Sequence, residues 1–275
     1  MTTDTTTSLP GSTGPAAQRP DGGVRTSLRI LAVGFSLLAV GWGALTVASL
    51  LARATEHRSA TYHGVRALDV DLSFESVEIV GSANATSVSM TRSYTWSLGK
   101  PSISNRVDGD LLSIGSSCPF SVGLGCSGHV RLVVPRDVEV RLHNSDGSVA
   151  MRDLDGPVDV ATSDGSINAS NLTGQLRLRT SDGSVVMTDL RSDRVDAATS
   201  DGSLHLSFVV DPSSVTARTS DGSIEVVVPA DGNAYNVTAS TSDGRREITV
   251  PTDSSSVRRM QLSTSDGAIR VLDRG

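Results

Sequence analysis

Seven aspartates, each at the centre of a Ser-Asp-Gly tripeptide, are the residues of this chain whose type and spacing are most suited to chemistry. They are Asp146, Asp164, Asp182, Asp201, Asp221, Asp243 and Asp266, separated by 18, 18, 19, 20, 22 and 23 residues. If the repeats stack in register, neighbouring carboxylates lie about 5 Å apart and repel by roughly 1 kcal/mol even in water. Something must offset that repulsion.

Two arrangements could offset it. Each carboxylate could accept a hydrogen bond from a nearby turn N–H group and stay hydrated. A divalent cation such as Ca²⁺ could instead lie between adjacent coils, where it would need roughly six to eight oxygen ligands. The nonapeptide pattern of calcium-binding β-rolls is absent, so we favour hydrated turn residues and keep the seven aspartates as candidate Ca²⁺ ligands. No other metal or cofactor is expected.

The two cysteines, Cys118 and Cys126, lie eight residues apart in a stretch rich in Gly and Ser. An isolated pair of this kind is typical of a disulfide formed in an oxidising compartment. A zinc site is disfavoured because the spacing is too long and His129 alone cannot complete the coordination. Two free thiols are the remaining alternative. The pair therefore predicts a disulfide on the extracytoplasmic side of a membrane.

Catalytic motifs are not evident in the sequence. The five histidines are scattered and unpaired: His57, His63, His129, His143 and His205. No nucleophile elbow, zinc-protease motif or P-loop is present. The Gly-x-Gly-x-x-Gly match at residues 123–128 lacks a surrounding βαβ unit and contains Cys126. We therefore expect no enzyme activity and no catalytic residues.

Short stretches of alternating apolar residues flank every tripeptide. Those that follow it are Val149/Met151, Ile167/Ala169, Val185/Met187, Leu204/Leu206, Ile224/Val226 and Ile269/Val271, and similar sets such as Leu176/Leu178/Thr180 precede it. A period of two predicts half-buried strands, and the glycine is expected to supply a turn with positive φ. Two strands and two turns in about 20 residues make one coil of a β-solenoid. The fold class is therefore all-β.

The solenoid is expected over residues 65–275. Residues 65–143 read as degenerate capping coils that carry the cysteine loop, and residues 144–275 hold the Ser-Asp-Gly repeats. Arg245 and Arg246 displace the apolar pair of the sixth coil, which makes that coil the least regular. The last strand, near Val271, is expected to leave an open sheet edge that charged residues or a partner must protect.

The first 64 residues predict a membrane attachment. Residues 1–27 have the composition of a disordered tail, 28–51 an uncharged stretch long enough for one transmembrane helix, and 52–64 a polar linker. A cleaved signal peptide is the alternative, because Ala52-Arg53-Ala54 has the form of a cleavage site, although the apolar stretch is longer than usual for one. Arginines flank both sides of the stretch, so the cysteines decide the orientation.

The repeats resemble those of the bacterial toastrack β-solenoid family of adhesin-like proteins. The resemblance covers about residues 65–275 and is carried by Thr162-Ser-Asp-Gly-Ser166, Thr180-Ser-Asp-Gly-Ser184, Thr199-Ser-Asp-Gly-Ser203 and Thr219-Ser-Asp-Gly-Ser223. It implies a non-enzymatic extracytoplasmic module, often associated with envelope stress and membrane partners. It provides no catalytic residues to carry over.

These observations predict a single-pass protein of the cell membrane, attached through residues 28–51, with its C-terminal domain outside the membrane as a binding or scaffold module. The expected partner is an envelope protein or a cell-wall polymer. Nucleic acid is excluded by charge, because residues 59–275 carry 19 basic and 27 acidic side chains. The alternatives are a structural protein that self-assembles through the solenoid edges and, least favoured, an enzyme acting on envelope polysaccharides. The oligomeric state is left open.

Overall fold

The computed structural model describes residues 33–43, 53–97, 99–119 and 125–274. The chain divides into two compact units, Met1–Leu51 and Ala52–Gly275. In the first unit, residues 33–43 form a helix. Among the described residues, no helix has both the length and the apolar character needed to cross a membrane. The predicted tail, and residues 28–32 and 44–51 of the predicted span, lie outside the described residues.

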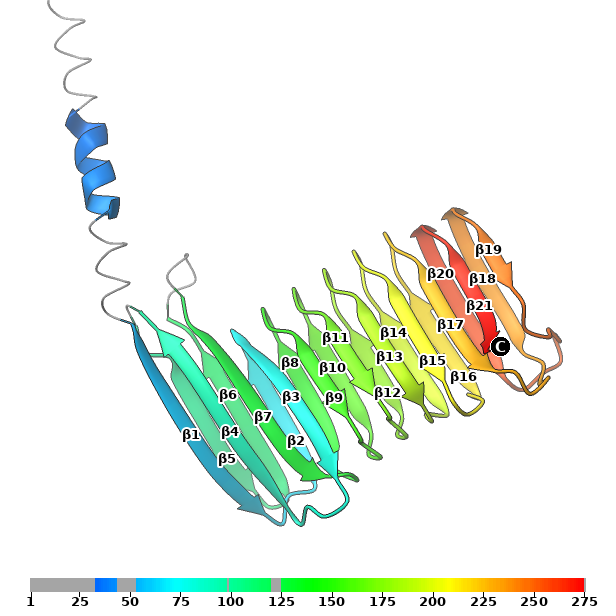
Figure 1. Ribbon diagram of the computed structural model, residues 1–275, viewed down its shortest axis with the longest axis horizontal. Helices are drawn as coiled ribbons and strands as arrows, with labels where there is room; N and C mark the ends of the chain where they lie inside the picture. The colour runs from blue at the N-terminus through cyan, green and yellow to red at the C-terminus, as the bar shows by residue number, and fades with distance from the viewer. Residues whose placement is uncertain (1–32, 44–52, 98, 120–124, 275) are drawn as a thin grey trace, which may run out of the picture. The chain divides into compact units, whose positions relative to one another are not determined.

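The second unit is an all-β solenoid of two facing sheets, as the sequence predicts (Figure 1). The 11-stranded sheet contains β1 (Ala54–His63), β3 (Glu75–Ser82), β4 (Ser87–Trp96), β7 (Ser127–Pro135), β9 (Val149–Arg152), β11 (Ile167–Ser170), β13 (Val185–Leu190), β15 (Leu204–Phe208), β17 (Ile224–Pro229), β19 (Arg246–Ile248) and β21 (Ile269–Arg274). The 10-stranded sheet contains β2 (Ala67–Leu72), β5 (Ser102–Asp108), β6 (Leu111–Ser117), β8 (Glu139–Asn144), β10 (Val158–Thr162), β12 (Leu176–Arg179), β14 (Arg194–Ala198), β16 (Ser214–Arg218), β18 (Asn236–Asp243) and β20 (Arg259–Asp266).

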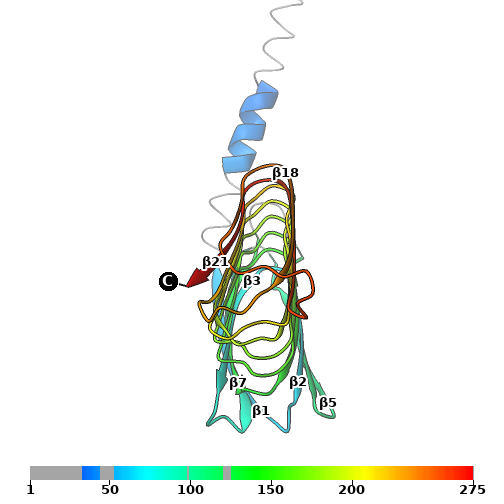
Figure 2. The ribbon, with the colours of Figure 1, turned by 90° about the vertical axis from the view of Figure 1, so that its right-hand side faces the viewer.

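The core is one thin apolar layer between the two sheets, which face each other closely along the whole stack (Figure 2). Equivalent strands of successive coils pair in parallel and in register. Each inward position therefore forms a column, for example Val158, Leu176, Val195 and Val215, all of them buried. Most inward side chains are aliphatic because the space between the sheets admits little else.

In most copies the glycine of the tripeptide has a different role from the one predicted. Positive φ angles are absent from Gly147, Gly165, Gly183 and Gly202, whereas Gly267 has a φ of 148°. What these positions require is the absence of a side chain, because a Cβ on Gly183 would lie 2.1 Å from the carbonyl oxygen of Gly165 in the preceding coil. Successive turns stack backbone on backbone, so glycine is needed for close approach.

From the third tripeptide onward, the threonine that precedes it joins one coil to the next. Thr199 Oγ1 donates to the carbonyl oxygen of Gly183 at 2.8 Å, and Thr180 Oγ1 donates to that of Gly165 at 2.9 Å. The same bond recurs from Thr219 and Thr264. The threonine hydroxyl of one coil can thus reach the glycine carbonyl of the adjacent coil, because the glycine has no side chain to block it. This contact explains why threonine and glycine recur together.

Thr199→Val is therefore expected to lower the free energy of unfolding by about 1 kcal/mol, the usual net contribution of one hydrogen bond. Thr162→Val is the matched control. Thr162 Oγ1 has no hydrogen-bond partner among the described residues, and the Gly147 carbonyl that it faces already accepts from Asn144 Nδ2 at 2.6 Å. The control should unfold at the same urea concentration as the wild type. Equal losses in both variants would contradict the hydrogen-bond explanation.

The opposite turn of the early repeats uses asparagine and aspartate for a backbone that few residues adopt. Asp153, Asn171 and Asp189 have φ angles of 60°, 51° and 53°. Among residues with a Cβ, Asn and Asp tolerate this left-handed region best. Asn171 Nδ2 also donates to Asp153 Oδ1 at 2.6 Å, which links adjacent turns. The buried Leu172 that follows Asn171 closes the core at this corner.

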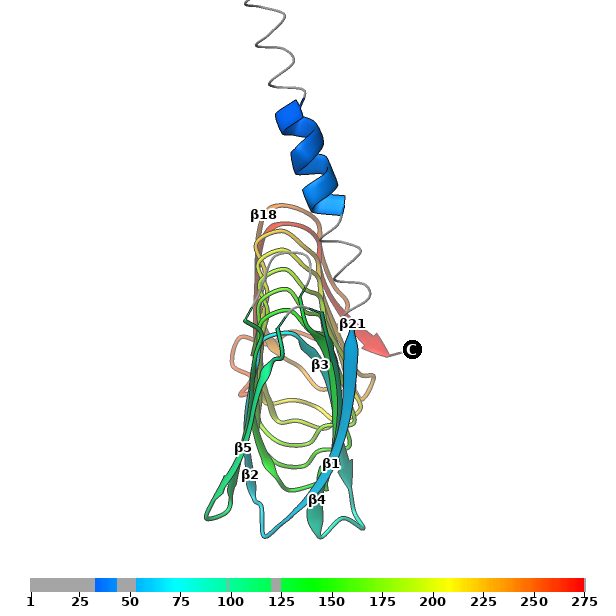
Figure 3. The same cartoon turned by 90° about the vertical axis from the view of Figure 1, so that its left-hand side faces the viewer.

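Antiparallel strands close the N-terminal end of the solenoid (Figure 3). β1 and β4 extend the 11-stranded sheet, and β5 extends the 10-stranded sheet. Residues 52–64 were predicted to be a linker, but Ala54–His63 is the edge strand β1, paired along its whole length with β4. The prediction was wrong because an edge strand with one half-buried face is nearly as polar as a linker.

The chain order is exchanged at both ends of the stack. β2 and β3 lie between β6/β7 and β8/β9, and β20 and β21 lie between β16/β17 and β18/β19. The final strand therefore does not form the open edge, contrary to the prediction. The sixth coil forms it, and its strand β19 has three residues, all exposed. Its weak apolar pattern suits a terminal position, where no further coil covers it.

Candidate functional site

The seven repeat aspartates form a single exposed row, here called the aspartate ridge. In spatial order they are Asp146, Asp164, Asp182, Asp201, Asp221, Asp266 and Asp243, because the last two coils are exchanged. The backbone N–H of Asp201 donates to the Ser181 carbonyl at 2.9 Å, and that of Asp221 donates to the Ser200 carbonyl at 2.9 Å. These bonds hold the turns in register.

The carboxylates of the ridge do not fold back onto the turn as predicted. None of the seven accepts a hydrogen bond or forms an ion pair within the part of the chain that the structure describes. The predicted Asp-to-turn bond is absent because the turn N–H groups are already used between coils. Across the described ranges, no three His, Cys, Asp or Glu side chains are grouped to hold a metal ion. Calcium binding by the ridge stays a prediction.

Asp201→Asn is therefore expected to stabilise the protein slightly, by less than about 1 kcal/mol, because it removes repulsion from Asp182 and Asp221 on either side. The gain should shrink as salt is added, since exposed charges are screened. Thermal melts at low and high ionic strength, with EDTA and with Ca²⁺, measure this. A variant that is less stable than the wild type only in Ca²⁺ would show that the ridge binds the cation.

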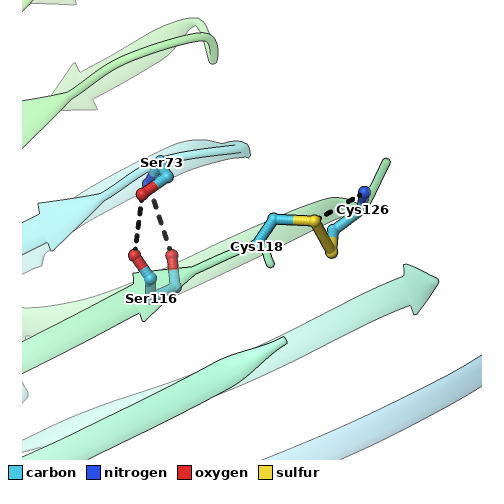
Figure 4. Close-up of a disulfide and its surroundings, with 4 residues drawn as sticks. All are labelled: Ser73, Ser116, Cys118 and Cys126. Carbon is cyan, nitrogen blue, oxygen red and sulfur yellow. Dashed lines mark hydrogen bonds between the residues drawn. A yellow bond between two sulfur atoms is a disulfide. The ribbon is translucent and has the colours of Figure 1, made fainter. Parts of the chain in front are cut away.

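The predicted disulfide is present. Cys118 and Cys126 are bonded, with their Cα atoms 5.9 Å apart, and the backbone N–H of Cys126 donates to Cys118 Sγ at 3.2 Å (Figure 4). The bond closes the connection between β6 and β7, which belong to opposite sheets of the capping coil. Next to it, Ser73 Oγ donates to the Ser116 carbonyl at 2.9 Å. The disulfide therefore secures the cap.

A cluster of arginines lies on the outer face of the 10-stranded sheet, and we call it the arginine cluster. Its members Arg177, Arg179 and Arg218 project from β12 and β16, around Asp196 on β14. Their nitrogens lie 3.9, 3.2 and 3.7 Å from the carboxylate oxygens of that aspartate. Each arginine side chain is about half exposed. Arg177 Nη1 also lies 3.6 Å from Asp159 Oδ2, so three guanidinium groups share two carboxylates and leave a local excess of positive charge.

This excess extends along the face. From β8 to β18 the outward positions carry six arginines and three carboxylates, although the whole chain has a net charge of −6. The residues are Arg141, Arg177, Arg179, Arg194, Arg218 and Arg259, with Glu139, Asp159 and Asp196. The acidic ridge and the basic face occupy different sides of the same coils. The molecule therefore presents two long surfaces of opposite sign.

The other sheet has a less charged outer face. A shallow hollow there is lined by short or uncharged side chains, among them Ala150, Asn168, Ser170 and Val186, with Glu78 and Arg152 at one end. His205 Nδ1 lies 3.0 Å from Glu225 Oε1, and the other four histidines are exposed. No catalytic pair of nucleophile and base is formed by the described residues of this hollow.

Two clusters were not found by sequence reasoning. At the corner near the C-terminal end, the Tyr235 hydroxyl donates to Asp211 Oδ1 at 2.9 Å, and Asn233 Nδ2 donates to Asp211 Oδ2 at 2.5 Å. Burial and the nearby Asp211 raise the pKa of Tyr235. At the N-terminal end, the Lys100 ammonium and the Arg58 guanidinium lower the pKa of Glu56 to about 2. Both join residues far apart in sequence, so no local motif marks them.

The fold and its surfaces define a class: a parallel β-solenoid with exchanged coils at both ends, a row of aspartates in its turns and a basic face. Comparison with known families agrees with this. The chain belongs to the Toastrack DUF4097 family, whose family model matches residues 126–272. The match covers the Ser-Asp-Gly repeats and the strand that follows Cys126.

Solved structures of low sequence identity are also similar in part. A "putative adhesin" from Bacteroides fragilis is 12% identical with a TM-score of 0.48, and the similarity covers 80% of this chain and 97% of that one. One from Parabacteroides distasonis is 12% identical with a TM-score of 0.47, at 80% and 97% coverage. One from Parabacteroides merdae is 10% identical with a TM-score of 0.43, at 80% and 96% coverage. No match was found among curated proteins.

Proposed function

We propose that this protein is a non-enzymatic binding module of the cell envelope, anchored in the cell membrane through residues 28–51 with its solenoid outside, and that its basic face binds an anionic cell-wall polymer. The arginine cluster carries this proposal. Three half-exposed guanidinium groups share two carboxylates, Asp159 and Asp196, so donors remain available for a phosphate or carboxylate ligand.

The geometry of the face suits a polymer better than a small molecule. Parallel coils repeat about every 4.8 Å, so Arg177 and Arg218 are held at fixed intervals by the backbone. A chain of repeated anionic groups can contact several such positions at once, and the contacts then reinforce one another. An association with envelope stress would follow if polymer binding at this face changed with the state of the wall.

The experiment compares two polymers and two variants. Full-length protein in nanodiscs is titrated with poly(glycerol phosphate) and with neutral dextran. Arg179→Gln/Arg218→Gln should weaken binding to the phosphate polymer at least about tenfold, since each lost charged contact contributes roughly 1 kcal/mol or more. Arg152→Gln, on the outer face of the other sheet, is the matched control and should bind as the wild type does.

Three results would overturn the proposal. One is equal binding of dextran and phosphate polymer, which would show that charge is not recognised. Another is an unchanged affinity of the double variant at low salt. Binding that strengthens with added salt would also contradict it, because attraction to exposed arginines is screened.

A second candidate function, self-association through the solenoid end, is favoured by β18. This edge strand is eight residues long and carries no charged side chain from Asn236 to Ser242. An open strand of this kind is a template for pairing with a second copy. Light scattering across protein concentrations tests it: self-association should be abolished by Ala239→Lys. A monomer at all concentrations would exclude this function.

A further inference from the structure

The N-terminal cap contains a cluster of aromatic and basic side chains that its packing alone does not require. Tyr94 and Trp96 stack with ring centroids 5.5 Å apart, and Lys100 Nζ lies 5.4 Å from the centroid of the Trp96 ring. Lys100 Nζ also lies 2.8 Å from Glu56 Oε2, and Glu56 Oε1 accepts from Arg58 Nε at 2.6 Å. We call this group the cap corner.

The cap corner lies where the solenoid begins. β1 and β4 are antiparallel, and their register places Ala54 opposite Trp96 and Glu56 opposite Tyr94. The first residue of the solenoid and the last residue of β4 are therefore neighbours, about 5 Å apart. Lys100 comes from the segment before β5, in the other sheet, and its ammonium group contacts Glu56 on β1 and Trp96 on β4. A surface that lies against Ala54 is therefore also within reach of Trp96 and Lys100.

The uncharged stretch ends at Leu51, three residues before Ala54. Three extended residues span at most about 11 Å. The headgroup region on each side of a bilayer is roughly 5–8 Å thick, from the difference between the full thickness and the hydrocarbon core. If residues 28–51 cross the membrane, the connection between them and β1 is too short to hold the cap corner away from the bilayer. The cap corner is then confined to the headgroup layer or its immediate boundary.

The chemistry of the cap corner matches that layer. Tryptophan and tyrosine are enriched at membrane interfaces, and lysine and arginine attract anionic headgroups. Lys100 is the one lysine among 24 basic residues, and only nine residues of the chain are aromatic. Arg58 and Lys100 both contact one carboxylate, Glu56, and Arg53 directly precedes β1, so the local charge is positive. The side chains of Lys100 and Arg58 are about half exposed, and Trp96 is partly exposed.

We propose that the cap corner, made by Trp96, Lys100 and Arg58, is a lipid contact that holds the base of the solenoid against anionic phospholipid headgroups. This inference rests on the proposed membrane anchor and adds a second attachment to it. The contact fixes the orientation of the solenoid relative to the membrane, because two points of attachment prevent the rotation of the solenoid that a single tether allows.

The test uses full-length protein with Trp42→Phe, so that Trp96 is the single tryptophan. The protein is reconstituted in phosphatidylcholine vesicles with and without phosphatidylglycerol, and brominated lipid is the quencher. Trp96 emission should shift to the blue and be quenched, more strongly with the anionic lipid. Lys100→Gln/Arg58→Gln should remove the dependence on phosphatidylglycerol. The matched control is Trp42→Phe/Trp96→Phe/Val257→Trp, which reports from the exposed Val257 at the other end of the solenoid and should not be quenched.

The two proposals fail differently. Release of the protein from the vesicles by carbonate would overturn the membrane anchor itself. Protein that resists carbonate, but whose Trp96 is quenched no more than the Val257→Trp control, would overturn the lipid contact and leave the anchor intact. Quenching that is equal in neutral and anionic vesicles would contradict the role of Lys100 and Arg58.

Discussion

Gly183→Ala is expected to lower the free energy of unfolding by about 3 kcal/mol, at the upper end of the usual cost of overpacking. The new Cβ would lie 2.1 Å from the oxygen and 2.6 Å from the carbon of the Gly165 carbonyl, both of them backbone atoms that cannot rotate away. The coils would have to separate, but the bonds from Thr180 and Asp182 to the preceding turn hold their spacing. Urea denaturation of the purified variant measures the loss.

Ser181→Ala is the matched control, because it lies in the same turn and its side chain is exposed. It should change the free energy of unfolding by no more than about 0.5 kcal/mol. If Gly183→Ala is as stable as this control, the turns are not stacked as closely as described. A large loss in both variants would indicate that the turn itself, and not its contact with the next coil, is sensitive.

Breaking the buried ion pair between Glu75 and Arg92 is expected to cost about 3–5 kcal/mol, because the remaining charge stays buried without a partner. Both side chains are fully buried between the sheets, and Arg92 bonds Glu75 through two nitrogens, each 2.5 Å from a carboxylate oxygen. Arg92 Nη1 also donates to the Gly115 carbonyl at 3.4 Å, in the opposite sheet. Arg92→Met and Glu75→Gln each test this by urea denaturation.

The double variant Glu75→Leu/Arg92→Met distinguishes a lost charge pair from lost packing. With no charge left in the core, it should be more stable than either single variant, as is often found when apolar residues replace a buried pair. Glu78→Gln is the exposed control, since Glu78 pairs with Arg131 and Arg152 at the surface, and it should cost less than about 1 kcal/mol. A double variant as unstable as the sum of the singles would contradict the argument.

The regular part of the solenoid could be predicted because the sequence has two periodicities, one of two residues within each strand and one of about 20 residues between coils. Alternation of apolar residues placed the strands of residues 144–229, and the repeat of about 20 residues placed their coils. Positions such as Leu176 and Val195 are buried and paired in register as expected. The exchanged ends could not be predicted, because alternation shows which face of a strand is buried and not which strand lies beside it.

The cap and the surfaces follow the same rule. Arg92 occupies an inward position of β4, in the same alternation as Val88, Met90 and Tyr94. A charged residue at a position where the alternation requires an apolar one indicates a buried ion pair, and this signal was not used in the prediction from sequence. Asp196 and its three arginines come from three coils, and only the register of those coils brings them together. The cysteine pair was found because its eight-residue spacing is local.

The exchange of coils at the two ends restricts how this chain can change in length. A coil gained by duplication in the middle of the stack, for instance beside β12 and β13, would pair with similar coils on both sides and would leave both ends of the solenoid unchanged. A coil added after Arg274 would instead emerge from between two coils that are already paired. The solenoid can therefore lengthen by tandem duplication of its interior repeats and not by extension of its tip. The length of the solenoid is a quantity that evolution can adjust in steps of one coil.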